Sequence, residues 1–195
     1  MSILPPNALD IIRAETADAH HALEQQLEIA RPDAGEDAYV RYLRALLGWL
    51  EPLEALLWQG PWPEAVGVAR RAGKARWIVA DLHARGLDAA EISAIPRRTV
   101  LAEQTSLVQR FGIAYVVEGA QLGGQVLLRR LGPRVAPLPT RFLVGYGRDC
   151  AKLWRSFVDA LAGALTDGEQ ARAAAASARA EFEAAHAWFA LQGAA

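Results

Sequence analysis

The stretch EGAQLGGQ, residues 118–125, places three glycines within six positions of an apolar segment that otherwise has helical composition. Inside a helix, each glycine costs about 1 kcal/mol relative to alanine. Gly119 and Gly123 are four residues apart and share a helix face, with Gly124 beside them. Two interpretations stay open: close packing against another helix through small residues, and close approach of the backbone to a ligand.

Length and composition point to one domain. The chain has 195 residues, of which 52% are hydrophobic, so we expect a single domain over residues 1–195 with one sizeable core. Helical spacing of apolar residues and the scarcity of β-branched runs predict an all-α fold. The formal net charge of -1 provides no basic surplus of the kind that nucleic-acid binding requires.

Cysteine content and hydropathy bear on the compartment. Cys150 is the single cysteine, which excludes a disulfide within the chain and fits a reducing cytosol. Residues 1–6 lack the charged and apolar regions of a secretory signal. No stretch approaches the roughly 18 uninterrupted apolar residues of a membrane span. We therefore expect a cytoplasmic protein without membrane contact.

The apolar pattern and its Gly and Pro interruptions predict six long helices. Their expected ranges are about 7–29, 36–58, 68–85, 99–131, 137–165 and 169–191. Pro52 falls inside the second range and is expected to kink or interrupt it. The glycines fall inside the fourth, which Gly132 and Pro133 are expected to end.

One histidine of the first range is a candidate metal ligand. His20 lies on a helix face of mainly apolar residues spaced three or four apart. The residues of this face are Leu9, Ile12, Thr16, His20, Leu23 and Leu27. Glu24 follows His20 by one turn and could orient the imidazole, as carboxylates commonly do for metal-bound histidines. The alternative is a core histidine with no ligand. One imidazole cannot form a closed zinc site, but it suits heme, because the porphyrin supplies the other four nitrogens.

Three parts of the chain then resemble one known family. Residues 12–24 read IRAETADAHHALE, and residues 115–126 read YVVEGAQLGGQV. The first is similar to the proximal-helix motif of heme oxygenases, and the second to their distal-helix motif. Residues 142–147 (FLVGYG), followed by residues 154–157 (WRSF), also resemble the bacterial branch associated with bacteriophytochromes.

This resemblance implies roles for individual residues. His20 would be the proximal iron ligand, with Thr16 four residues before it and Glu24 as its hydrogen-bonding partner. The heme would be sandwiched between this proximal helix and a kinked distal helix that carries three catalytic glycines: Gly119, Gly123 and Gly124. Arg13 and Arg155 stand where basic residues of the family meet the heme propionates, and the arginine fork suits carboxylates.

The resemblance also implies a reaction and partners. Heme, both substrate and cofactor, would be cleaved with O2 to biliverdin, carbon monoxide and ferrous iron. The chain contains no flavin or nucleotide fingerprint, so electrons would come from a ferredoxin or an NAD(P)H-linked reductase. The biliverdin would supply a bacteriophytochrome.

One position departs from the family pattern. Many heme oxygenases carry an aspartate directly after the first distal glycine, where it holds the water that protonates bound dioxygen, whereas this chain has Ala120. Backbone carbonyls or Gln121 could hold that water instead. Ala120 keeps a second function open, that of a heme carrier or sensor without turnover. A thiamine-degrading or diiron relative of the same fold is a third alternative, although Cys150 and the available carboxylates do not match such sites.

Overall fold

The structure is a computed structural model that describes residues 7–100 and 105–194. Within those ranges, the regular structure is helical, and the predicted all-α class is confirmed. The longer helices are α1 (Ala8–Gln26), α2 (Glu36–Leu57), α3 (Ala75–Ala84), α5 (Leu107–Val135), α7 (Cys150–Ala164) and α8 (Gly168–Leu191). The shorter ones are η1 (Glu28–Ala30), η2 (Glu64–Val66), η3 (Val68–Arg70), α4 (Ala89–Ser93), α6 (Arg141–Val144) and η4 (Gly147–Asp149).

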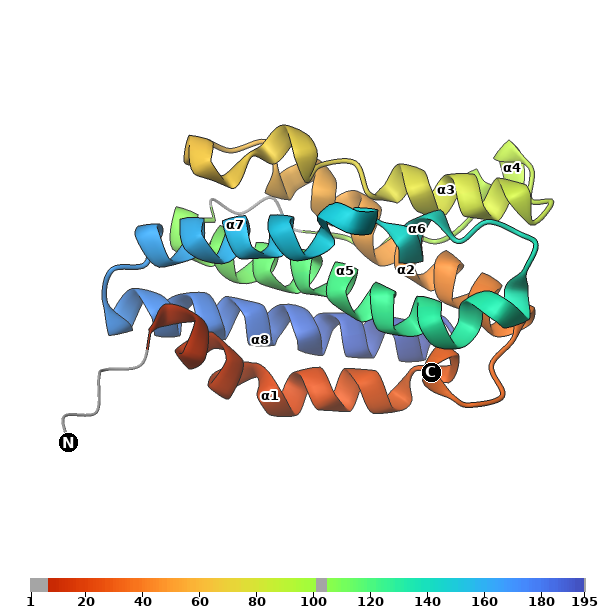
Figure 1. The fold of residues 1–195 in the computed structure, drawn as a ribbon, viewed down its shortest axis with the longest axis horizontal. Helices are drawn as coiled ribbons and strands as arrows, with labels where there is room; N and C mark the ends of the chain where they lie inside the picture. Colours follow the sequence, from red (N-terminus) through yellow and green to blue (C-terminus); the bar gives the residue numbers. More distant parts are fainter. Residues whose placement is uncertain (1–6, 101–104, 195) are drawn as a thin grey trace.

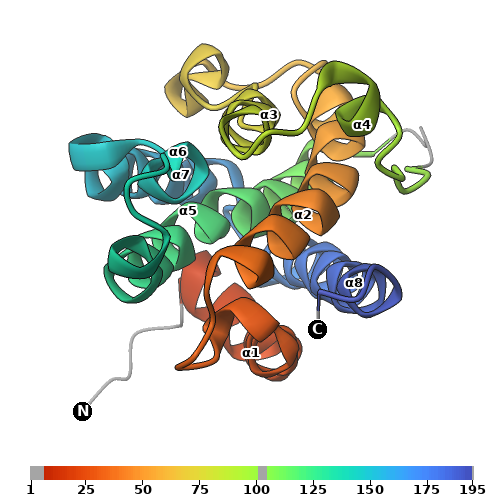
Figure 2. The ribbon, with the colours of Figure 1, turned by 90° about the vertical axis from the view of Figure 1, so that its right-hand side faces the viewer.

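Helix α8, the last helix, connects the first helix to the middle of the bundle. It packs along α1 and along α5, and α1 runs beside it in the same direction (Figure 1). Seen end-on, α1 and α8 form the lower layer, α5 and α2 the middle, and α3 the top, with α6 and α7 flanking α5 (Figure 2). Direct contacts between α1 and α5 are few, so these two helices are held in place mainly by α8.

The helix starts follow local capping chemistry. The Asn7 side chain accepts a hydrogen bond from the backbone N–H of Asp10 at 3.0 Å and starts α1. Ser106 and Gln109 form a capping box at the start of α5. The fourth helix was expected to begin near residue 99, but it begins at Leu107. Residues 101–104 lie outside the described part of the chain.

Helix α2 passes through Pro52 without a break, contrary to the expected interruption. Proline has no backbone N–H and leaves the carbonyl four residues earlier without its helical partner. In this chain the Gly48 carbonyl accepts a hydrogen bond from the backbone N–H of Arg98 at 3.0 Å. A long-range contact therefore replaces the bond that the proline removes.

Two other expected helices are divided. The range 137–165 contains α6, η4 and α7, because Gly145 (φ 50°) and Gly147 (φ 56°) turn the chain out of the helical region. The range 68–85 is divided into η3 and α3, with Gly73 at φ 81° between them. At the end of α5, Pro133 lies in the last turn, and the helix continues to Val135.

None of the helices in residues 7–100 and 105–194 combines the length and apolarity needed to cross a bilayer.

Candidate functional site

The apolar face of the first helix is buried at its start and becomes more accessible at His20. Ile12 and Thr16 are buried against the core, whereas the His20 side chain on the same face is 50% exposed. The His20 ring contacts the edge of Phe182 on α8, with ring centroids 5.1 Å apart and planes at 88°. The imidazole is thus held from one side and open on the other, which is the arrangement that a ligand-binding histidine needs.

Glu24 lies where the sequence predicts it, one turn beyond His20. Its Oε2 is 3.6 Å from Nδ1 of His20. This distance is too long for a good hydrogen bond but short enough for an electrostatic contact that orients the ring. Because Glu24 faces Nδ1, Nε2 is the nitrogen placed to bind a metal.

Helix α5 presents a bare face made of Gly119, Gly123 and Val126, which we call the open face. A methyl group placed on Gly119 or Gly123 would meet no atom within 4 Å. Val126 lies two turns beyond Gly119 on this face and is 43% exposed. The two glycines therefore face open space, and the packing interpretation does not explain them. An apolar surface without side chains near the backbone fits a flat macrocycle.

Phe182 on α8 lies between His20 on α1 and Tyr115 on α5, near the open face. It contacts the His20 ring on α1 and lies 6.5 Å, between ring centroids, from Tyr115 on α5. Tyr115 is one turn before Gly119 on the same side of α5. His20 and the open face therefore flank the same stretch of α8, in agreement with the packing of α8 against both helices.

Tyr115 is a candidate site residue that the sequence analysis did not assign. Burial raises the pKa of its phenol, and the neighbouring Thr16 hydroxyl and Arg13 guanidinium oppose that rise. Its ring centroid lies 5.7 Å from that of Trp154 on α7, the residue before Arg155. The exposed Arg13 and Arg155 thus come from two helices that approach Tyr115. Its four-residue spacing from Gly119 was the signal available in the sequence.

Two residues differ from the expected arrangement. A methyl group on Gly124 would lie 3.4 Å from the Leu143 carbonyl oxygen, so Gly124 packs against α6 and is not part of the open face. The Gln121 side chain points to Gly145, where an added methyl group would meet its Oε1 at 1.9 Å. Gln121 therefore cannot hold water on the open face as the sequence analysis considered.

The available side chains favour a bound group that itself supplies most of the ligand atoms for its metal. Within residues 7–100 and 105–194, no three histidine, cysteine or carboxylate side chains gather as a metal cluster. A diiron site would need several such residues on facing helices. His20 with the open face instead fits a porphyrin, which needs one axial imidazole and room for its planar ring.

Comparisons with known proteins agree with this geometry. The family model described as heme oxygenase matches residues 7–191. A heme oxygenase from Neisseria meningitidis, solved with NO and CO bound, is similar in structure with a TM-score of 0.74. That match covers 96% of this chain and 92% of the other at 17% sequence identity, and it shows the shared fold. A comparison with curated proteins finds no match. From the family match across almost the whole chain, this protein belongs to the heme oxygenase family.

Proposed function

We propose that the protein cleaves heme to biliverdin, carbon monoxide and ferrous iron, using O2 and electrons from an external donor. The observation that supports this best is the pairing of a half-exposed His20 with a glycine face into which added methyl groups would meet nothing. A family match over residues 7–191 adds independent support.

The open face determines which part of the substrate is exposed to reaction. Bound heme supplies the iron that binds O2 and the ring that is oxidised. His20 would bind the iron through Nε2 and leave its other side open. Gly119 and Gly123 would let the α5 backbone lie close to the ring of the substrate and leave room for O2 beside it. Positioning of this kind favours ring oxidation over other reactions.

The cations and hydroxyls around Tyr115 are suited to the propionates. Arg13 on α1 is exposed and neighbours Tyr115 and the buried Thr16, and the exposed Arg155 follows Trp154, the α7 residue that packs on Tyr115. Arginine binds carboxylates through two parallel hydrogen bonds. Such contacts would fix the rotation of the ring in its plane.

For Arg13→Ala, we expect the Kd for hemin to rise about fivefold to tenfold, which corresponds to about 1–1.4 kcal/mol, the net contribution of one ordinary hydrogen bond at an exposed site. Titration by absorbance measures this change. Hemin dimethyl ester has no free carboxylate and provides the control. If Arg13→Ala weakens the binding of the ester as much as that of hemin, Arg13 does not bind a propionate.

Delivery of protons cannot use a side chain at residue 120. Ala120 is half-buried and has no acidic group, and Gln121 points away. We propose that water held by backbone carbonyls of α5 carries out this step. Electrons would come from a ferredoxin or an NAD(P)H-linked reductase in the cytoplasm. Supply of biliverdin to a bacteriophytochrome remains part of this proposal.

Addition of hemin followed by ascorbate in air tests the proposed reaction. The Soret band should appear on binding and decay after ascorbate, while the broad red absorption of biliverdin grows. A Soret band that persists under these conditions identifies a carrier or sensor, the second candidate, which the alanine at position 120 favours. No spectral change on hemin addition would contradict both.

Ala120→Asp distinguishes whether residue 120 borders the reacting side of the heme. An added carboxylate there should reorganise the distal water, change the spectrum of the ferric complex and raise the pH midpoint at which that water ionises, because a negative charge disfavours hydroxide. Optical titration between pH 6 and about pH 10 covers the range in which metal-bound water commonly ionises. A ferric spectrum identical to that of the parent would show that residue 120 does not face the iron.

A further inference from the structure

A buried cluster of charges lies on the face of α5 next to the open face, about 100° around the helix from it. Its centre is Glu118, the residue before Gly119. Arg71 Nη1 donates to Glu118 Oε2, and Lys74 Nζ lies 2.8 Å from Oε1. Tyr146 also donates its hydroxyl to Oε1, at 3.0 Å. The side chains of the three charged residues are each 1% exposed.

The partners of Glu118 are themselves fixed to other elements. Arg71 donates from Nε to the Val66 carbonyl at 2.5 Å and from Nη2 to the Leu153 carbonyl at 3.0 Å. Lys74 Nζ is 3.7 Å from Oε1 of Glu54 on α2. The carboxylate of Glu118 therefore connects α5 to the surroundings of α2, α3 and α7, and a shift of α5 would disturb contacts in each.

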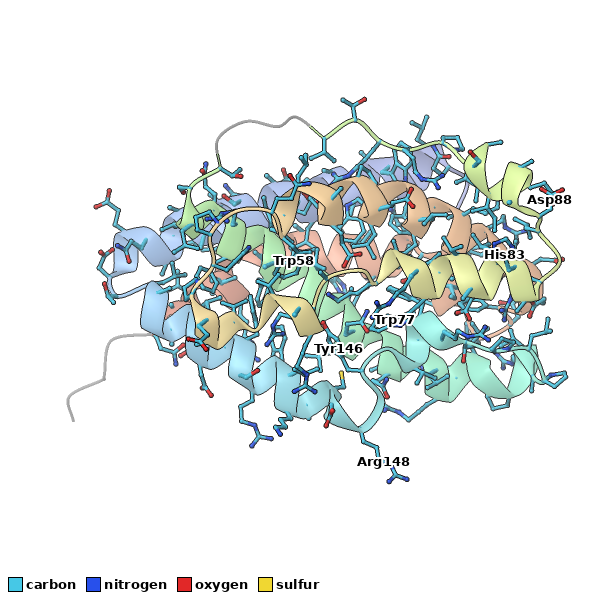
Figure 3. The ribbon with its side chains drawn as sticks, turned by 90° about the horizontal axis from the view of Figure 1, so that it is seen from above. Trp58, Trp77, His83, Asp88, Tyr146 and Arg148 are labelled. Carbon is cyan, nitrogen blue, oxygen red and sulfur yellow. The ribbon has the colours of Figure 1, made fainter. Side chains whose placement is uncertain are left out.

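Tyr146 reaches the cluster because of a glycine on each side of it. Gly145 (φ 50°) and Gly147 (φ 56°) turn the chain between α6 and η4. The Tyr146 ring then packs edge-on against Trp77, with centroids 5.8 Å apart, and Figure 3 shows the two residues next to each other beside α3. Burial, followed by the neighbouring Glu118 carboxylate, raises the pKa of the Tyr146 phenol, so it remains a hydrogen-bond donor. The FLVGYG segment thus positions the Tyr146 hydroxyl to donate to Glu118.

Such a cluster is a poor means of gaining stability alone. Buried ion pairs are often replaceable by apolar residues without loss, and the best-supported reason for keeping them is that they specify one arrangement. Gly119 and Gly123 have no side chains that could hold the open face at a fixed distance from a neighbouring helix. Contacts between α5 and α1 are also few. Packing on α8 holds the helix as a whole, and the contacts of Glu118 fix α5 at the residue next to Gly119.

We infer that Glu118 and Tyr146 are positioning residues that set the height and rotation of the Gly119 backbone over the heme. This inference rests on the proposed function for its effect on turnover, but not for its effect on a bound diatomic ligand. The helical backbone is stiff, and Glu118 is bonded directly to Gly119. A change in the cluster is therefore transmitted to the open face without any contact between the cluster and heme.

Tyr146→Phe tests this with Tyr39→Phe as the matched control. Both substitutions remove a phenol hydroxyl that donates to a buried carboxylate, since Tyr39 donates to Asp81 at 2.9 Å and the half-buried Tyr146 donates to Glu118 at 3.0 Å. The Tyr39–Asp81 pair joins α2, α3 and the start of α6, and its hydrogen-bond partners lie outside α5. Both variants should lose similar thermal stability without heme. Only Tyr146→Phe should shift the C–O stretching frequency of the ferrous CO complex, which reports on the distal surroundings.

The rate of heme turnover should also distinguish Tyr146→Phe from Tyr39→Phe. Since a misplacement of about 1 Å can cost about 100-fold in rate, we expect kcat of Tyr146→Phe to fall at least about tenfold. The Kd for hemin should stay within about twofold of the parent value, because no group that binds heme is removed. Glu118→Gln, which leaves Arg71 without its carboxylate partner and Lys74 with Glu54 alone, should shift the C–O stretch in the same direction as Tyr146→Phe.

The outcomes separate this inference from the proposed function. If Tyr146→Phe leaves the C–O stretch unchanged, or shifts it no more than Tyr39→Phe does, the positioning role is wrong even when the parent degrades heme. If the parent binds heme without degrading it, while only Tyr146→Phe shifts the stretch, the positioning role stands and the proposed reaction fails. A parent that binds no hemin overturns both.

Discussion

His20→Ala should abolish heme turnover and remove the spectrum of histidine-ligated iron. The His20 imidazole is half-exposed beside Phe182, and alanine supplies no donor atom. Loss of a mere outer partner of a metal ligand commonly costs about 10–100-fold in affinity or activity, so loss of the ligand should cost more than about 100-fold in kcat. Absorbance titration with hemin and the rate of biliverdin formation measure both effects.

The adjacent His21 provides the control for this substitution. Its ring nitrogen already contacts the Gln25 amide at 2.7 Å, on a different face of α1. His21→Ala should therefore bind and degrade heme like the parent, and added imidazole should partly restore the ligated spectrum to His20→Ala. Heme degradation at the parental rate by His20→Ala would refute the ligand assignment and direct attention to His21 or His83.

Gly123→Leu should stabilise the protein without heme and block heme binding. A side chain at residue 123 meets no atom within 4 Å at its first carbon, and leucine is favoured over glycine in a helix by roughly 0.5–1 kcal/mol. The same side chain would occupy the space assigned to the macrocycle, so we expect the Kd for hemin to rise by at least about tenfold. Thermal unfolding without heme and hemin titration measure the two opposite effects.

Gly112, on the same helix, provides the control for Gly123, because it packs closely against α8. A methyl group there would lie 2.0 Å from the Ala174 carbonyl oxygen of α8. Gly112→Ala should destabilise the protein by about 1–3 kcal/mol, as overpacking of a core does, with hemin affinity of the folded protein retained. If Gly123→Leu instead unfolds the protein or binds heme normally, residue 123 does not border the heme.

Local patterns predicted much of the helical framework. The face through Ile12 and Thr16 is buried as expected, and the last helix begins and ends within one residue of its predicted range. These features depend on spacing and caps that lie close together in the chain. The division of the range 137–165 depended on the left-handed glycines around Tyr146, a signal that was present in the sequence and not weighed.

Features that depend on distant partners were not predictable. The continuity of α2 at Pro52 requires the backbone of Arg98, and the burial of Arg71 and Lys74 requires Glu118, tens of residues away. Gly119, Gly123 and Gly124 are alike in the sequence, and only their neighbours distinguish the packing glycine from the two on the open face. Tyr115 likewise became a candidate through contacts across three helices.

A crystal structure of the complex with hemin tests the central claim most directly. The iron should be bonded to Nε2 of His20, with the ring between α1 and α5 and the backbone at Gly119 and Gly123 against its other side. Iron bonded to a different residue, or a ring lying away from these two glycines, would contradict the account.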